Sequence, residues 1–215
     1  MVLGRKPSEN KTLSGSNPLP SAINNIMRTK IINLARRTDR WNTVVPEVRK
    51  FGIDDFERFD AIDGGSVAYL GFNQSMHFAL ENEGEVLLLE DDVVFLGTIE
   101  RLLAAKAELP VDWDLLYFGA TLKSPIQRYS DRLYRISDAW TSHAILYSDK
   151  GAKYCFENFD PAEGMIYDEW LRTHAQVHLQ CFIIYPMLAV QAEGWSDIWG
   201  LNTYYGIEAS GSNFV

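Results

Sequence analysis

Four consecutive apolar residues, from Val86 to Leu89, limit the possible folds of this 215-residue chain more than any other feature. Polar residues do not alternate with apolar ones along this run, so the sequence predicts a strand that is covered on both faces. A strand of this kind is typical of α/β proteins, in which helices pack on both sides of the sheet. The chain length and the hydrophobic fraction of 47% suit one domain with a substantial core.

Predicted strands and helices alternate around this run. Strands are expected over residues 31–34, 56–61, 113–118, 133–137, 144–147 and 180–185, and helices after Thr38, Gly71 and Thr98, from Asp149 and over 167–174. The spacing in the first half is typical of βαβ units, and the second half is more mixed. We therefore expect an α/β sheet that is parallel at first and gains antiparallel strands later.

The remaining segments set the expected domain organisation. Residues 1–28 are polar and lack periodicity, so we interpret them as a flexible N-terminal arm, with a single domain over 29–215. Residues 121–132 are also polar, and we interpret them as a lid that closes over a site.

The charge of the chain makes some classes of partner unfavourable, and its cysteine content indicates the expected compartment. The net charge of -9 and the pI of about 4.9 disfavour nucleic acids and anionic membranes. The sequence contains no segment of transmembrane length, so no transmembrane segment is expected. Cys155 and Cys181 lie far apart outside any CxxC pattern, which favours free thiols in a reducing compartment; we expect a cytoplasmic protein.

Three carboxylates follow the apolar run directly, at Glu90, Asp91 and Asp92. In open α/β sheets, ligands bind beyond the carboxyl ends of the strands. Neighbouring carboxylates repel one another unless a cation compensates them, and oxygen ligands suit Mn²⁺ or Mg²⁺ together with diphosphate oxygens. The alternative is an acidic turn in water, but the buried strand before it favours a metal site.

The segment from Asn33 to Arg40 follows the first predicted strand and includes Leu34 and Arg37. Arginines beside a helix N-terminus can hold the phosphates of a nucleotide or stack on its base. A solvated helix start is the alternative for such a run of charges. A GxGxxG fingerprint is absent from the sequence, so a dinucleotide-binding turn is not expected.

Two later segments carry further acidic candidates. Asp168 and Glu169 open the helix predicted after Ile166, and either one is a candidate general base among aromatic neighbours. A helix cap and a first-turn acid are the structural alternatives. Asp197 follows the last strong strand and is a candidate to complete the metal site, with a loop Asx-turn as its alternative.

Taken in order, these segments resemble glycosyltransferase family 25, the lipopolysaccharide-type and collagen-type galactosyl- and glucosyltransferases. The matching pieces are INLARRTDR at 32–40, FDAIDG at 59–64, GFNQS at 71–75, LEDDV at 89–93, WDLLY at 113–117 and the segment 185–198. The family tends to place a Ser-His pair shortly after the glycine that matches Gly71, whereas His77 here is displaced by one position. On a helix that displacement turns the side chain by about 100°, so no role is assigned to His77.

The resemblance implies a GT-A fold, which is a Rossmann-like nucleotide-diphospho-sugar transferase fold with a mixed central sheet flanked by helices. It implies an inverting transfer of galactose or glucose from a UDP-sugar donor to a hydroxyl of a saccharide or glycoconjugate acceptor, as in lipopolysaccharide biosynthesis. It also places Asp92 and Glu90 on the metal, Mn²⁺ or Mg²⁺, with Asp197 as a further candidate. The residues implied to bind the nucleotide sugar are Asn33, Leu34, Arg37, Arg40, Asp63, Ser75, Asp91 and Gln191.

Within this interpretation, Asp168 is the first candidate for the base that removes the acceptor proton, and Glu169 is the second. Two other classes of function remain open. A nucleotidyltransferase or phosphohydrolase can use the same acidic strand end. A non-catalytic carbohydrate-binding relative would bind sugar without turning over a donor.

Overall fold

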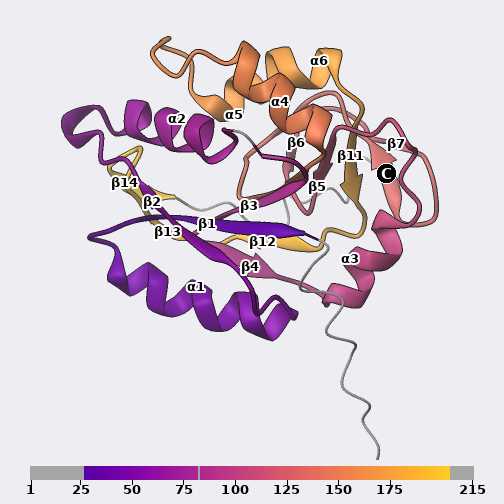
Figure 1. Cartoon of the computed structure of the whole chain (residues 1–215), viewed down its shortest axis with the longest axis horizontal. Coiled ribbons are helices and arrows are strands. Elements are labelled where there is room, and N and C mark those ends of the chain that lie inside the picture. Colours follow the sequence, from indigo (N-terminus) through magenta and orange to yellow (C-terminus); the bar gives the residue numbers. More distant parts are fainter. Residues whose placement is uncertain (1–26, 82, 204–215) are drawn as a thin grey trace, which may run out of the picture.

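The computed structural model describes residues 27–81 and 83–203 and is built around one large sheet (Figure 1). The strands of this sheet are, in spatial order, β2 (Glu57–Ala61), β1 (Arg28–Leu34), β3 (Val86–Glu90), β10 (Ala144–Tyr147), β5 (Leu115–Tyr117), β11 (Cys181–Ile184), β8 (Leu133–Arg135) and β7 (Gln127–Arg128). The predicted arm lies outside the described residues except for its last two residues, and Arg28 already belongs to β1.

Strand directions change from one half of the sheet to the other. β1 runs parallel to both β2 and β3, and β5 runs parallel to β11. β10 lies between β3 and β5 and is antiparallel to both, while β8 is antiparallel to β11 and β7 to β8. These pairings confirm a mixed sheet whose first strands are parallel, as the spacing of the elements predicts.

Helices cover both faces of the sheet (Figure 1). One layer holds α1 (Thr38–Phe51) and α3 (Ile99–Lys106), and the other holds α2 (Ala68–Ala79), α4 (Asp149–Asn158), α5 (Tyr167–Trp170) and α6 (Gln176–His178). A π-helical turn, η3 (Leu171–Ala175), joins α5 to α6, and a 3₁₀ turn, η2 (Gly65–Val67), precedes α2. This arrangement confirms the predicted α/β class.

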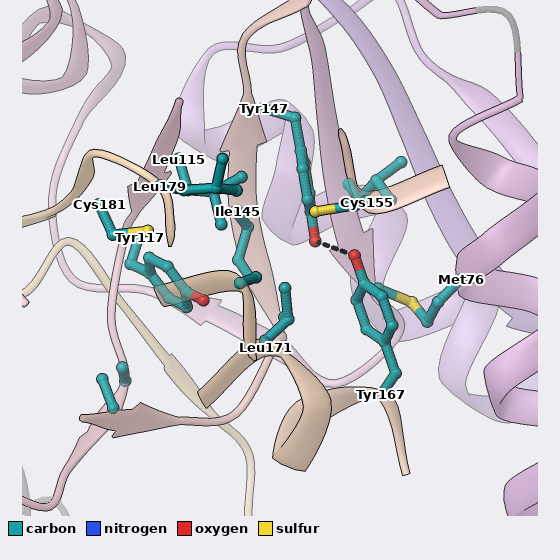
Figure 2. Close-up of a cluster of buried hydrophobic side chains, with 14 of the residues drawn as sticks. Met76, Leu115, Tyr117, Ile145, Tyr147, Cys155, Tyr167, Leu171, Leu179 and Cys181 are labelled. Carbon is teal, nitrogen blue, oxygen red and sulfur yellow. Dashed lines mark hydrogen bonds between the residues drawn. The ribbon is translucent and has the colours of Figure 1, made fainter. Parts of the chain in front are cut away.

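The hydrophobic core has two parts, one on each face of the sheet, and β3 contributes side chains to both, as its uninterrupted apolar run predicts. Leu87 and Leu89 pack toward α1 and α3, whereas Val86 and Leu88 pack toward α2 and α4, and all four are 0% exposed. Figure 2 shows the second core, where the buried Cys155 lies beside tyrosine side chains. Both cysteines are free and buried, as predicted.

Three two-stranded ladders complete the fold. They are β4 (Val93–Phe95) with β12 (Ala189–Gln191), β6 (Thr121–Leu122) with β9 (Ala139–Trp140), and β13 (Gly194–Ser196) with β14 (Leu201–Thr203). The predicted lid over 121–132 is therefore partly held in ladders, because it contains β6 and the edge strand β7. No helix among the described residues is long and apolar enough to cross a membrane.

Two helix starts differ from the predictions. Helix α1 begins at Thr38 itself rather than after it, with Arg37 at the cap position. Helix α2 begins at Ala68, before Gly71, and packs closely on the preceding loop. A Cβ on Gly71 would lie 2.3 Å from the Ile62 carbonyl oxygen and 2.4 Å from the Gly64 nitrogen, so this contact needs glycine.

Candidate functional site

A pocket of about 350 Å³ lies at the carboxyl ends of β1 and β3, where a ligand site is expected in an α/β sheet. Most of the predicted site residues line it: Leu34, Arg40, Asp63, Ser75, Glu90, Asp91, Asp92, Asp168, Gln191 and Asp197. Asn33, Arg37 and Glu169 are not among the lining residues. The structure therefore brings together side chains that are up to 163 residues apart, from Leu34 to Asp197.

Arg40 neutralises the acidic turn after β3. Its Nη1 lies 2.7 Å from Asp91 Oδ1 and 3.2 Å from Asp92 Oδ2. Asn33 also donates to Asp91, at 2.6 Å, and Gln191 donates to Asp92, at 3.2 Å. The Oδ1 atom of Asp92 is buried and has no hydrogen-bond partner among the described residues. One carboxylate oxygen of the turn is therefore available to a cation or a ligand.

Glu90 and Asp168 meet at the hydroxyl of Ser142, which precedes β10. Ser142 Oγ lies 2.7 Å from Glu90 Oε1 and 2.5 Å from Asp168 Oδ1. A serine hydroxyl has one hydrogen to donate, so one of these two short contacts needs a proton on a carboxyl group. Ser142 Oγ therefore bridges the two carboxyl groups.

Burial and repulsion both favour the protonated forms of these carboxyl groups. Burial raises the pKa of Glu90 well above its ordinary value, and the nearby Asp92 and Asp168 raise it further. Burial likewise raises the pKa of Asp168 to about 6, with repulsion from Asp92 and Glu169 adding to it. The pKa of Asp92 also rises to about 6 through burial, although Arg40 opposes the shift. Three carboxyl groups thus converge in the pocket.

Glu169 points away from this group. Its carboxylate pairs with Arg172, whose Nη2 lies 2.5 Å from Oε1, and that hydrogen bond lowers the pKa of Glu169. Asp168 lines the pocket and contacts Ser142, whereas Glu169 does neither. This geometry favours Asp168 over its neighbour as a proton acceptor.

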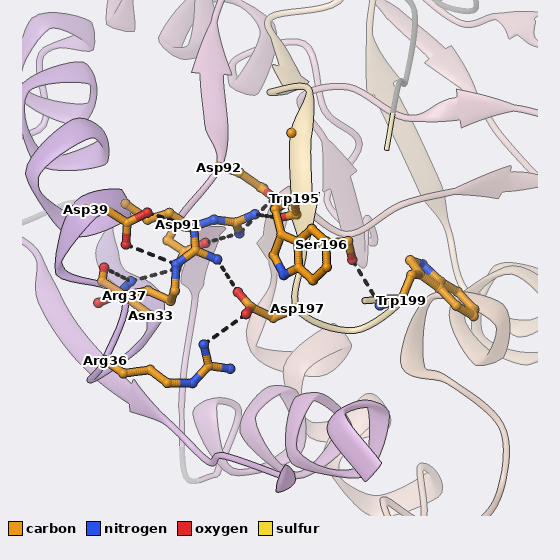
Figure 3. A network of polar contacts seen from close by, with 12 residues as sticks. Asn33, Arg36, Arg37, Asp39, Asp91, Asp92, Trp195, Ser196, Asp197 and Trp199 are labelled. Carbon is orange, nitrogen blue, oxygen red and sulfur yellow. Dashed lines mark hydrogen bonds and ion pairs between the residues drawn. The ribbon is translucent and has the colours of Figure 1, made fainter. Parts of the chain in front are cut away.

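The Asp197 carboxylate lies against two arginines of the segment after β1 (Figure 3). Arg36 Nη1 is 2.9 Å from Asp197 Oδ1, and Arg37 forms a close ion pair with Oδ2. Arg36 also pairs with Asp63 at 2.9 Å, and Arg37 with Asp39 at 2.8 Å. The two ion pairs of Asp197 tie the residue after β13 to the segment after β1. A metal-binding role for Asp197 stays a prediction.

Ser75 binds protein backbone at the edge of the pocket. Its hydroxyl donates to the Gly71 carbonyl oxygen at 2.6 Å and accepts from the Ile62 amide at 2.8 Å. These bonds hold the loop before α2 against the helix. Nucleotide binding by Ser75 also stays a prediction.

Several polar or aromatic side chains of this site were not predicted from the sequence, among them Ser142, Lys123, Trp140 and Thr141. Ser142 joins the two carboxyl groups, and Lys123, Trp140 and Thr141 line the pocket. The residues between 133–137 and 144–147 carried no motif, and only the placement of β10 brings them to the pocket. A single serine between predicted strands gives no sequence signal of its own.

The donor chemistry around Asp92 suits a hard cation, although it is not a ready-made metal centre. Within residues 27–81 and 83–203, no group of three acidic, histidine or cysteine side chains is arranged to hold a metal ion. Oxygen atoms are the ligands that Mn²⁺ and Mg²⁺ prefer. Asp92 has an unpartnered Oδ1 atom and lies close enough to Glu90 to raise the pKa of that carboxyl group. Asp92 and Glu90 are the residues that would hold such an ion.

No family model matches this sequence, and no curated protein matches it. A protein from STIV is 12% identical, with a TM-score of 0.46 over 77% of this chain and 86% of its own. CTP:phosphocholine cytidylyltransferase from Streptococcus pneumoniae is 10% identical, with a TM-score of 0.44 over 77% and 93%. A mutant of Drosophila β-1,4-galactosyltransferase 7 with manganese, UDP-Gal and xylobiose is 15% identical, with a TM-score of 0.44 over 75% and 66%. These TM-scores are too low to decide the fold family or the function of this chain.

Proposed function

We propose that this chain is a metal-dependent, inverting glycosyltransferase of the GT-A type, related to family 25. It would move galactose or glucose from a UDP-sugar to a hydroxyl of a saccharide or glycoconjugate. The observation that carries the proposal is the convergence of Glu90, Asp92 and Asp168 in one pocket beyond the buried strand β3. The resemblance of segments 32–40, 59–64 and 89–93 to the family supports the same assignment.

The charges around the pocket support a donor that binds together with a divalent cation. Arg36 and Arg40, which line the pocket, are already paired with carboxylates. A diphosphate would therefore add negative charge to a pocket whose lining already has more carboxylates than basic side chains. A cation held by Asp92 and Glu90 would neutralise the diphosphate and the leaving nucleotide.

Asp168 is the residue that suits proton removal from the acceptor. A general base works best when its pKa lies near the working pH, and burial raises the pKa of Asp168 to about 6. Ser142 holds the carboxyl group at 2.5 Å and so fixes its direction in the pocket. Attack by the acceptor oxygen from the side of the sugar opposite the diphosphate inverts the anomeric carbon.

The proposal is tested by donor binding with and without Mn²⁺. UDP-galactose, UDP-glucose, GDP-mannose and CMP-sialic acid are each titrated by calorimetry into the wild type and into Asp92→Asn. A UDP-hexose should bind the wild type in the presence of Mn²⁺, and Asp92→Asn should lose that metal-dependent binding while it keeps its fold. Asp131→Asn, at a solvent-exposed carboxylate that pairs with Arg128, is the matched control and should bind as the wild type does.

Two results would contradict the proposal. Unchanged Mn²⁺-dependent affinity in Asp92→Asn would remove the acidic turn from donor binding. Release of pyrophosphate from a nucleoside triphosphate, without any transfer from a UDP-hexose, would assign the same pocket to a nucleotidyltransferase.

A further inference from the structure

One wall of the pocket, formed by Lys123, Trp140 and Thr141, has no role in the chemistry described above. We call it the β6–β9 wall, because its residues belong to that ladder or follow it. Trp140 pairs with Thr121 in the ladder, and the Lys123 amide donates to the Asp138 carbonyl oxygen at 2.9 Å. The ladder thereby places Lys123 Nζ over the Trp140 ring, 5.0 Å from its centroid.

Two polar atoms of consecutive residues in the β6–β9 wall lack partners among the described residues. Trp140 Nε1 and Thr141 Oγ1 are both buried and make no hydrogen bond to any described residue. Buried polar groups in folded proteins are nearly always hydrogen-bonded, so each such atom calls for an explanation. Because both side chains line the pocket, hydroxyl groups of a bound ligand would supply the missing partners.

The backbone is strained at Thr141, directly before the serine that contacts the two carboxyl groups. Its φ of 80° is the only positive value at a non-glycine residue within the described ranges. A β-branched residue rarely adopts this conformation, and such strain persists where the surrounding structure maintains it, often at binding sites. The next residue, Ser142, contacts Glu90 and Asp168, so the strained turn connects the wall directly to the proposed base.

The charge of the wall differs from that of the rest of the pocket. Arg36 and Arg40, the other basic residues that line the pocket, are both paired with carboxylates. Lys123 is exposed and forms no ion pair with any residue that the structure describes. Lys123 is close enough to Glu169 to help Arg172 lower the pKa of that carboxyl group, but no carboxylate among the described residues holds it in an ion pair, so an anionic group at this end of the pocket would find a counterion.

We propose that the β6–β9 wall binds an acidic sugar, which is a sugar that carries a carboxylate or a phosphate. The anionic group lies on Lys123 Nζ, and ring hydroxyls bond to Thr141 Oγ1 and Trp140 Nε1. A further hydroxyl of the same sugar faces Asp168, so the acidic sugar is the acceptor; this last step rests on the proposed function, whereas the binding itself does not.

Three probes separate the possible sources of the negative charge. Methyl β-D-glucuronide carries a carboxylate, glucose 6-phosphate carries a phosphate, and methyl β-D-glucoside is neutral. Each is titrated into the UDP- and Mn²⁺-treated wild type and followed by saturation-transfer NMR and tryptophan fluorescence. At least one acidic probe should bind roughly tenfold more tightly than the neutral one, the size expected of a hydrogen bond to a charged group.

Variants then assign the binding to the wall. Lys123→Gln should abolish the preference for the acidic probe, whereas Lys50→Gln, at an exposed lysine on α1, should keep it. Thr141→Ala should weaken acidic and neutral probes alike by about threefold to tenfold, and Thr141→Ser should restore both. The second pair separates loss of the hydroxyl from a general disturbance of the turn.

The outcomes distinguish this inference from the proposed function. Equal affinity for acidic and neutral probes, no binding of any probe, or a preference that survives in Lys123→Gln would each overturn the acidic-sugar site. If the wild type instead binds an acidic probe through Lys123 but does not bind a UDP-hexose, the wall is a sugar site and only the transferase proposal fails.

Discussion

Asn73 holds the start of α5, and replacing it with alanine tests how Asp168 is kept in place. The Asn73 side chain is 0% exposed. Its Nδ2 donates to the Met165 carbonyl oxygen at 2.8 Å, and its Oδ1 accepts from the Tyr167 amide at 2.9 Å. These two bonds fix the backbone on either side of Ile166, directly before Asp168. Without them, the proposed base would lose its support from α2.

The magnitude follows from the two backbone groups that Asn73→Ala leaves without a partner. Each unsatisfied buried group costs about 1–3 kcal/mol, so the free energy of unfolding should fall by about 4 kcal/mol. At a urea dependence of about 2 kcal/mol per molar, the midpoint of unfolding should fall by about 2 M. Urea titrations followed by circular dichroism and by tryptophan fluorescence measure this shift.

Asn158→Ala is the matched control. Asn158 also donates to a backbone carbonyl, that of Tyr154 at 2.8 Å, but it is exposed at the end of α4. Water can replace that bond, so this variant should stay within about 0.5 kcal/mol of the wild type. If Asn73→Ala also stays within about 1 kcal/mol, Asn73 does not hold α5 and the reasoning is refuted.

Three further predictions concern titratable groups. Asp168→Asn should keep donor affinity and lower turnover by about two to four orders of magnitude, whereas Glu169→Gln should stay near the wild type; equal losses in steady-state assays would contradict the assignment. Burial lowers the pKa of His143 to about 4, below the value of about 6.5 for the unfolded chain, so its contribution to stability should fall by roughly 3 kcal/mol as the pH drops from about 6.5 to about 4. His143→Gln should remove this pH dependence of the free energy of unfolding, measured by chemical denaturation across the same pH range. If the free energy of unfolding of the variant changes with pH as steeply as that of the wild type, the reasoning is refuted. Burial raises the pKa of Cys155 to about 12, so Cys155 and the equally buried Cys181 should react with a thiol reagent such as DTNB only after denaturation, and rapid labelling of the native protein would contradict this.

Short sequence patterns determined the fold class of this protein and the position of its pocket. The run from Val86 to Leu89 predicted a strand covered on both faces, and each of its side chains is fully buried in β3. The carboxylates that follow it lie at the pocket for the same reason, since the end of a central strand is also the edge where ligands bind. Periodicity and strand ends are properties of short segments, so the sequence carries them directly.

Tertiary structure alone decided which side chains meet. β10 enters the sheet between β3 and β5, and only this placement brings Ser142 to Glu90 and Asp168. The pairing of Asp197 with Arg37 joins residues 160 positions apart, and no spacing rule predicts it. Buried polar and charged groups need partners, and the order of the strands decides which partners lie close to them. The chemical roles of single residues therefore depend on neighbours that are distant in the sequence, whereas the fold class depends on neighbours within a few positions.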